Sequence, residues 1–209
     1  MNIIDQLKWR YATKKFDASK VLSEEKINIL KQAFNLTATS YGLQSLKLVI
    51  VTNAAIRKEL VQHSYGQEQV LNASHLLVIC IKDDILDTDV DKHFDTIKDV
   101  RSTPETILAP YRIDLKKMMA TKSIEERLEW STKQAYIALG NLMTVCAIEQ
   151  IDSCPMEGFN PIEYDSLLQL REKGLKSVLL LPVGYRAEDD MFAGFKKVRK
   201  QVIETVIEM

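Results

Sequence analysis

The sequence predicts a single domain that mixes helices and strands, in the α+β or α/β class. Helical and β-rich segments intermix along the 209 residues, with more helix than strand, and no clear domain boundary appears within residues 1–209. Apolar residues make up 46% of the chain and charged residues 27%. That balance, at this length, is typical of a globular domain that buries a substantial core.

Three apolar segments predict the strands. Residues 46–51 are β-rich, residues 75–81 form a continuous apolar run with the length of a buried strand, and residues 177–183 form another such run. The longest apolar runs are far too short to span a bilayer, so we expect no membrane-spanning segment.

Capping residues predict where most of the helices begin. Helices are expected directly after Ser23, Asn53, Ser123 and Asn160. Ser123 and Glu126 fit a capping box that opens a long helix. Gly174 is expected to end the helix that starts at Asn160.

The remaining segments give weaker patterns. Ile3 and Leu7 suggest a short first helix, and residues 37–44 are expected to form a loop. Residues 83–122 are charged and are predicted to be helical, with Pro104 at a helix start. The C-terminal tail is polar and then basic.

Charge and cysteine usage limit the partners and the compartment. A net charge of −1 gives no strong field for DNA or an anionic membrane, so we expect neither as a partner. The three cysteines, Cys80, Cys146 and Cys154, form no C-x-x-C pair and fit a reducing compartment. The first residues show no basic region followed by an apolar stretch, so no signal peptide is expected. We therefore expect a cytoplasmic protein.

Several kinds of catalytic centre lack their sequence patterns. No H-E-x-x-H motif and no cysteine–histidine cluster is present, so we expect no metal. No G-x-G-x-x-G, G-x-x-x-x-G-K-[ST] or G-x-S-x-G motif occurs, and seven glycines leave no glycine-rich phosphate loop. The three histidines are scattered, and His75, beside a strand, is interpreted as structural.

What remains is a set of cationic residues near both ends of the chain. Arg10 and Lys14 lie four residues apart, and residues 196–200 place four cations in five positions. One interpretation is two solvated clusters of charge. The other is that the two ends meet at one bound phosphate, which Arg can contact in a bidentate manner and Lys as a point charge.

At these residues the chain resembles the nitroreductase family. The resemblance covers nearly the whole chain, through motifs that follow one another in the family's order. These motifs are residues 10–17 (RYATKKFD), 39–44 (TSYGLQ), 65–70 (YGQEQV) with 73–75 (ASH), 133–136 (KQAY) with 140–141 (GN), 155–159 (PMEGF) and 197–199 (KVR).

The resemblance implies an α+β, nitroreductase-like fold with a central, mainly antiparallel sheet wrapped by helices, in an intertwined homodimer. It also implies that each dimer holds FMN at its interface. The resemblance implies that Arg10, Lys197 and Arg199 bind the FMN phosphate and that Lys14 reaches the flavin ring or ribityl chain. Thr39 and Ser40 would approach the FMN of the partner subunit. The backbone N–H groups of Glu157 and Gly158 would face the N5 and O4 edge of the flavin. Tyr11, Ala12, Pro155 and Met156 belong to the same motifs.

Some positions depart from the family pattern. Ala12 replaces the usual serine, and Ser45 and Leu46 replace the usual proline and tryptophan after the flavin loop. The family commonly places an asparagine and a lysine beside the flavin pyrimidine, where this chain offers Gln67 and Gln69.

The function implied by the resemblance is an FMN-dependent oxidoreductase with NADH or NADPH as hydride donor. Flavin N5 would pass hydride by a ping-pong mechanism to small-molecule acceptors, namely nitroaromatics, quinones or quinonoid dihydropteridines. No side chain is expected to act as acid or base. The alternatives are a flavin or ene-type reductase on the same fold, a non-catalytic FMN-binding redox protein, and an interaction module with a basic tail.

Overall fold

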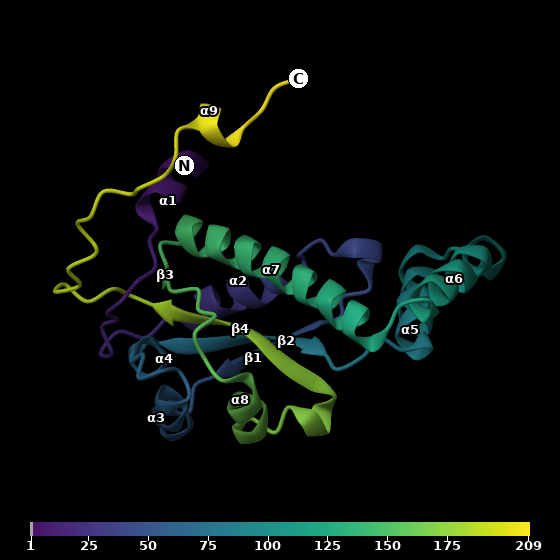
Figure 1. Cartoon of the computed structure of the whole chain (residues 1–209), viewed down its shortest axis with the longest axis horizontal. Helices are drawn as coiled ribbons and strands as arrows, with labels where there is room; N and C mark the ends of the chain where they lie inside the picture. The colour runs from purple at the N-terminus through teal and green to yellow at the C-terminus, as the bar shows by residue number, and fades with distance from the viewer. Residues whose placement is uncertain (1) are drawn as a thin grey trace.

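A four-stranded antiparallel sheet lies at the centre of the protein (Figure 1). The computed structural model describes residues 2–209. The strands lie in the order β1-β2-β4-β3, and every neighbouring pair is antiparallel. Their bounds are Leu46–Val51 for β1, His75–Lys82 for β2, Asp152–Ser153 for β3 and Leu175–Gly184 for β4. The predicted α+β class and the antiparallel sheet are confirmed, while the two-residue β3 was not predicted.

Both faces of β2 are buried, which explains its continuous apolar run. Leu77 and Ile79 belong to the core on one face of the sheet, and Leu76 and Val78 belong to the core on the other face. All four side chains have no exposed surface. Alternation along a strand therefore places apolar side chains on two cores at once.

Two helices cover one face of the sheet (Figure 1). These are α2, Glu24–Asn35, and the long α7, Ile124–Ile148. Their caps are the predicted ones: the Ser23 side chain accepts a hydrogen bond from the backbone of Lys26, and Ser123 and Glu126 form a reciprocal capping box.

The opposite face is covered by α3, Ala54–Gln62, α4, Gln69–Asn72, and α8, Pro161–Leu167. The predicted end of α8 at Gly174 is wrong. Gln169 adopts φ +52°, and the N–H of Leu170 donates to the carbonyl of Asp165 at 2.8 Å, which closes the helix seven residues earlier than expected. Gly174 instead ends a separate 3-10 turn, Arg171–Lys173.

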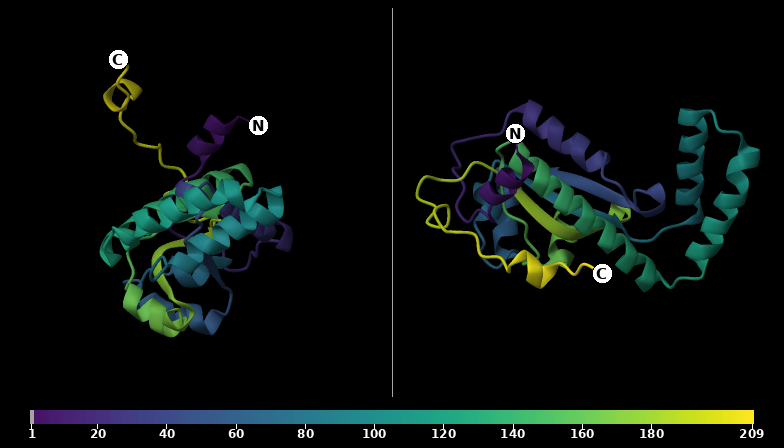
Figure 2. Two further views of the ribbon diagram at one scale, coloured as in Figure 1. Left: turned by 90° about the vertical axis from the view of Figure 1, so that its right-hand side faces the viewer. Right: turned by 90° about the horizontal axis from the view of Figure 1, so that it is seen from above.

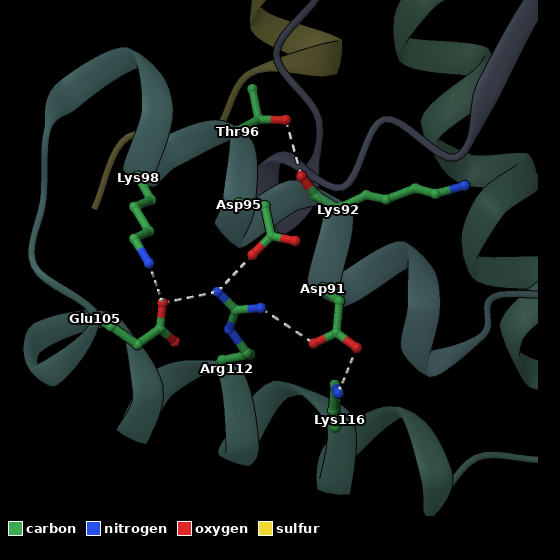
Figure 3. Close-up of polar contacts among 8 residues, drawn as sticks. All are labelled: Asp91, Lys92, Asp95, Thr96, Lys98, Glu105, Arg112 and Lys116. Carbon is green, nitrogen blue, oxygen red and sulfur yellow. Dashed lines mark hydrogen bonds and ion pairs between the residues drawn. The ribbon is translucent and has the colours of Figure 1, made fainter.

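Residues 83–122 form a helical hairpin that projects from one end of the body, as Figure 1 and the right-hand view of Figure 2 show. It comprises α5, Asp87–Arg101, and α6, Glu105–Ala120, and Pro104 precedes α6 as predicted. We call this hairpin the arm. It has a small apolar core of its own and a network of ion pairs centred on Arg112 (Figure 3).

Both chain ends extend away from the body at the upper left of Figure 1, and the views in Figure 2 show them diverging from each other. Helix α1, Ile3–Trp9, was predicted, whereas the single-turn elements η1, Ser40–Gly42, and α9, Val202–Thr205, were not. The C-terminal tail that carries α9 is exposed along residues 196–209. Within residues 2–209, no helix is both long enough and apolar enough to cross a membrane. The three cysteines are buried and free, as expected.

Candidate functional site

The N- and C-terminal cationic segments meet in one pocket of about 540 Å³. Residues 8–12 form one wall and residues 192–199 the other, with Arg186 between them. The proximity of the two chain ends, which the second interpretation of the sequence required, is therefore observed. The pocket includes five of the residues singled out from the sequence, namely Arg10, Tyr11, Ala12, Lys197 and Arg199.

Three cations of this pocket share one electrostatic environment. Burial and the nearby Arg199 guanidinium lower the pKa of Arg10. Burial, Arg10 and Arg199 lower the pKa of Lys197 in the same way. Among the described residues no carboxylate forms an ion pair with any of the three, and the buried Nε of Arg10 has no hydrogen-bond partner. Such an arrangement favours the binding of an anion.

Backbone hydrogen bonds join the first cationic motif to the segment after β4. The N–H of Asp17 donates to the carbonyl of Tyr185, and the N–H of Ala187 donates to the carbonyl of Lys15, both at 2.9 Å. These bonds place residues that are about 170 positions apart in the sequence beside each other. Lys197 also donates its ammonium to the carbonyl of Arg10.

Arg186 also lines this pocket, and no pattern in the sequence indicated it. Its Nε donates to Asp152 Oδ1 at 2.7 Å, and its backbone N–H donates to Asp152 Oδ2 at 2.8 Å. Its guanidinium lies 4.5 Å from the ring centroid of Trp9 and 4.6 Å from that of Tyr11. The two rings are thus held by cation–π contacts to an arginine that is itself fixed by a buried carboxylate.

The loop at residues 155–158 runs along β4. The backbone of Met156 exchanges two hydrogen bonds with Leu180, at 2.9 and 3.0 Å, so the loop is anchored to the sheet there. The next two N–H groups, of Glu157 and Gly158, have no acceptor within the described part of the chain. The carboxylate of Glu157 accepts a hydrogen bond from Tyr136 at 2.6 Å, which raises the pKa of that tyrosine. The loop therefore presents two adjacent free donors on a fixed backbone.

Gln67 supports this loop from the side. Its Nε2 donates to the carbonyl of Gly158 at 2.9 Å and to that of Ser64 at 3.1 Å. A Cβ at position 158 would lie 2.9 Å from the same Nε2, so glycine permits the close approach. Gln69 begins α4 and is 8% exposed, and its side chain has no hydrogen bond within residues 2–209.

The remaining site residues predicted from the sequence are Lys14, Pro155, Thr39 and Ser40. The backbone N–H of Lys14 donates to Asp190 at 3.0 Å, and Pro155 follows the buried Cys154. Thr39 lines a separate groove of about 680 Å³, and the N–H of Ser40 donates to Gln134 at 2.8 Å. The single chain thus assembles the N- and C-terminal motifs but leaves the residue 39–44 loop outside their pocket.

The α+β domain thus carries a cationic pocket and a loop of free N–H donors, a combination suited to an anionic ligand that also has hydrogen-bond acceptors. The family model described as the nitroreductase family matches residues 7–185. The chain belongs to the nitroreductase family of oxidoreductases.

Three proteins whose names call them putative nitroreductases illustrate the similarity. One from Staphylococcus aureus, named for NAD(P)H, is 32% identical over 99% of this chain and 94% of its own length. The crystal structure of YdfN from Bacillus subtilis superposes with a TM-score of 0.88 at 18% identity, covering 99% and 98% of the two chains. The FMN complex from Exiguobacterium sibiricum gives a TM-score of 0.84 at 15% identity, covering 100% and 98%.

Proposed function

We propose that the protein is an FMN-dependent oxidoreductase that uses NADH or NADPH to reduce small-molecule acceptors. The observation that carries this proposal is the pocket where Arg10, Lys197 and Arg199 converge without a carboxylate partner. The FMN complex and the NAD(P)H name among its relatives support the choice of cofactor and hydride donor. When bound, FMN supplies a ring nitrogen, N5, that takes up hydride from the donor and passes it to the acceptor in a ping-pong cycle.

The protein's first task in this reaction is to hold the cofactor phosphate. Arg10 and Arg199 can each present paired N–H donors to phosphate oxygens, and Lys197 adds a further positive charge. The buried Nε of Arg10, which lacks a partner, would gain an acceptor in this way. This chain needs no glycine-rich loop for phosphate binding because side chains from both termini replace it.

The second task is to orient the flavin ring. The N–H groups of Glu157 and Gly158 are free of acceptors among residues 2–209 and lie on a loop anchored to β4 through Met156. These two donors would hold the N5 and O4 edge of a bound flavin, which would orient the ring for hydride transfer and adjust its reactivity. We assign the pyrimidine side to Gln67 and Gln69, of which Gln67 already contacts the loop through Gly158.

We also propose that the active form is a homodimer. Thr39 and Ser40 lie away from the chain's own cationic pocket, so they are assigned to the flavin site of a partner subunit. The C-terminal tail leaves the body (Figure 1). It exposes several large apolar side chains. The most exposed of these are Val198, Val202, Ile203, Ile207 and Met209. Covering such surface against a second copy would remove it from water.

The direct test is the purified protein itself. We expect it to be yellow, with FMN released by acid and identified by mass, and we expect NAD(P)H to bleach the bound flavin rapidly. Comparison of nitroaromatics, quinones, quinonoid dihydropteridines, enones and free FMN as acceptors then separates the proposed activity from a flavin or ene-type reductase. A colourless protein that binds no added FMN would refute the proposal, and bound FMN without bleaching would indicate a non-catalytic redox protein.

Substitutions in the pocket test the phosphate assignment. We expect Arg10→Ala or Arg199→Ala to weaken FMN binding roughly ten- to a hundredfold, because a charge-assisted hydrogen bond contributes about 1.5–3 kcal/mol. Lys200→Ala is the matched control, since Lys200 neighbours Arg199 but does not line the pocket. Flavin fluorescence titration measures the three dissociation constants. Equal effects at all three positions would indicate a diffuse charge effect instead of a phosphate site.

A further inference from the structure

Asp190 lies at the junction of the two cationic segments and is almost fully buried, at 5% exposure. Its Oδ2 accepts hydrogen bonds from the Tyr11 hydroxyl at 2.8 Å and from the backbone N–H groups of Lys14 and Lys15 at 3.0 and 3.1 Å. Its Oδ1 accepts from the N–H of Phe192 at 3.1 Å. One carboxylate therefore joins the segment that carries Arg10 to the turn that leads into the C-terminal tail.

The four hydrogen bonds use both oxygens and favour the ionised carboxylate. Burial is the largest single influence and would raise the pKa of Asp190, but the hydrogen bonds from Lys15, Tyr11, Lys14 and Phe192 together lower it below its usual value. An asparagine at this position has one acceptor oxygen and would direct an NH₂ group at donors. The amide is therefore a poor replacement although it has the same size.

Charge explains why the junction needs such a clamp. Besides burial, Arg199 lowers the pKa of Arg10, and Arg10 and Arg199 both lower the pKa of Lys197, so the three cations repel one another when no anion lies between them. The hydrogen bond from the ammonium of Lys197 to the carbonyl of Arg10 offsets part of this repulsion. Asp190 touches none of these three side chains but holds the backbone on both sides of them.

We propose that Asp190 is a positioning residue for phosphate binding, which holds the N- and C-terminal cationic segments at the separation that a phosphate group requires. This inference rests on the proposed FMN function and deepens it. It predicts that Asp190 affects the affinity for the phosphate of FMN more than the affinity for the flavin ring.

Two flavins and a matched pair of variants test this inference. Binding of FMN and of riboflavin, which lacks the phosphate, is measured for the wild type, Asp190→Asn and Asp189→Asn. Asp189 is the control because it is the adjacent carboxylate, is exposed and, among residues 2–209, pairs only with Lys15. We expect Asp190→Asn to weaken FMN binding by about tenfold or more while riboflavin binding changes little, and Asp189→Asn to change neither.

Each outcome decides a different statement. If Asp190→Asn leaves the ratio of the FMN and riboflavin affinities unchanged, the positioning role is overturned and only a structural role remains. A wild type that binds neither flavin would refute the proposed function instead. If Asp190→Asn does not fold, Tyr11→Phe removes a single donor to Asp190 and keeps the ring over Arg186. The same selective loss, of smaller size, is then expected, and its absence would overturn the inference.

Discussion

The body and the arm are stabilised in different ways. In the body, the sheet is buried between two apolar cores, and side chains such as Leu142 on α7 and Leu77 on β2 have no exposed surface. In the arm, α5 and α6 share only a small core around Phe94 and Leu115, and much of their contact surface is charged.

Arg112 is the centre of that charged surface (Figure 3). Its guanidinium contacts Asp91, Asp95 and Glu105 at 3.2, 2.9 and 3.2 Å, and its side chain is 15% exposed. Lys116 pairs with Asp91 at 2.7 Å and extends the network along α6. Packing against the sheet fixes the body, whereas the arm depends on interactions that salt and pH can change. Changes in salt or pH should therefore weaken the arm without weakening the body.

The largest expected difference between the two regions is in the free energy of unfolding that a cavity removes from the body and from the arm. We expect Leu142→Ala to lower the free energy of unfolding by about 2–5 kcal/mol, because it removes a fully buried side chain from the main core. Leu115→Ala, the same change in the arm, should cost less of the global free energy because that helix can open locally. Urea denaturation followed by far-ultraviolet circular dichroism measures both. Equal losses would show that arm and body unfold as one cooperative unit.

A smaller effect should follow from removing the central arginine of the arm. Arg112→Gln leaves three carboxylates without their shared cation, so amide hydrogen exchange in α5 and α6 should become faster while exchange in the sheet stays unchanged. Since surface ion pairs contribute about 0.2–1 kcal/mol each and three are lost, we expect exchange in the arm to become roughly three- to a hundredfold faster. Lys133→Gln is the control, because Lys133 forms a single exposed pair with Glu129 on α7. Faster exchange throughout the sheet in Arg112→Gln would contradict a separate arm.

The smallest effect is expected from acid. Hydrogen bonds from Arg127 lower the pKa of Asp84 at the base of the arm, and those from Lys116 lower the pKa of Asp91 within it. Because folding depresses these values, their stabilisation is present above the unfolded aspartate value of about 3.9 and is lost as pH falls through the folded values. Trp130, which packs on the arm's core, reports this in a Trp9→Phe variant. Its fluorescence should change at a higher pH than the far-ultraviolet circular dichroism of the whole protein. Transitions at the same pH would show that the arm is no more sensitive to acid than the body.

Local sequence patterns predicted most of the fold. The strand at residues 46–51 and the capping box of Ser123 and Glu126 have the predicted bounds, because apolar runs and caps act through near neighbours. The end of α8 was predicted wrongly since Gln169 adopts the left-handed conformation that the prediction reserved for Gly174. The two-residue β3 carries no period that a sequence pattern could reveal.

The site was predictable to a different extent. Charge alone suggested that the two ends of the chain could meet, and the resemblance supplied the individual roles of residues such as Arg10 and Arg199. Neither source indicated Asp152, Arg186 or Asp190, because each acts on partners far away in the sequence: Asp190 and Tyr11 are 179 positions apart. Contacts over such separations leave no spacing that a single sequence displays.

Gly42 is the point where the arm meets the loop that carries Thr39 and Ser40. It has φ +71°, and a Cβ added there would lie 2.8 Å from Cε1 of His93 on α5. Tyr41 in the same loop stacks on Trp130 at 6.3 Å and reaches Met118 on α6 with its hydroxyl. The 16 residues of α6 span about 24 Å, so a tilt of about 5° at this contact moves the far end by about 2 Å. A side chain larger than glycine at position 42 would press on α5, so the packing at this loop sets where the far end of the arm lies.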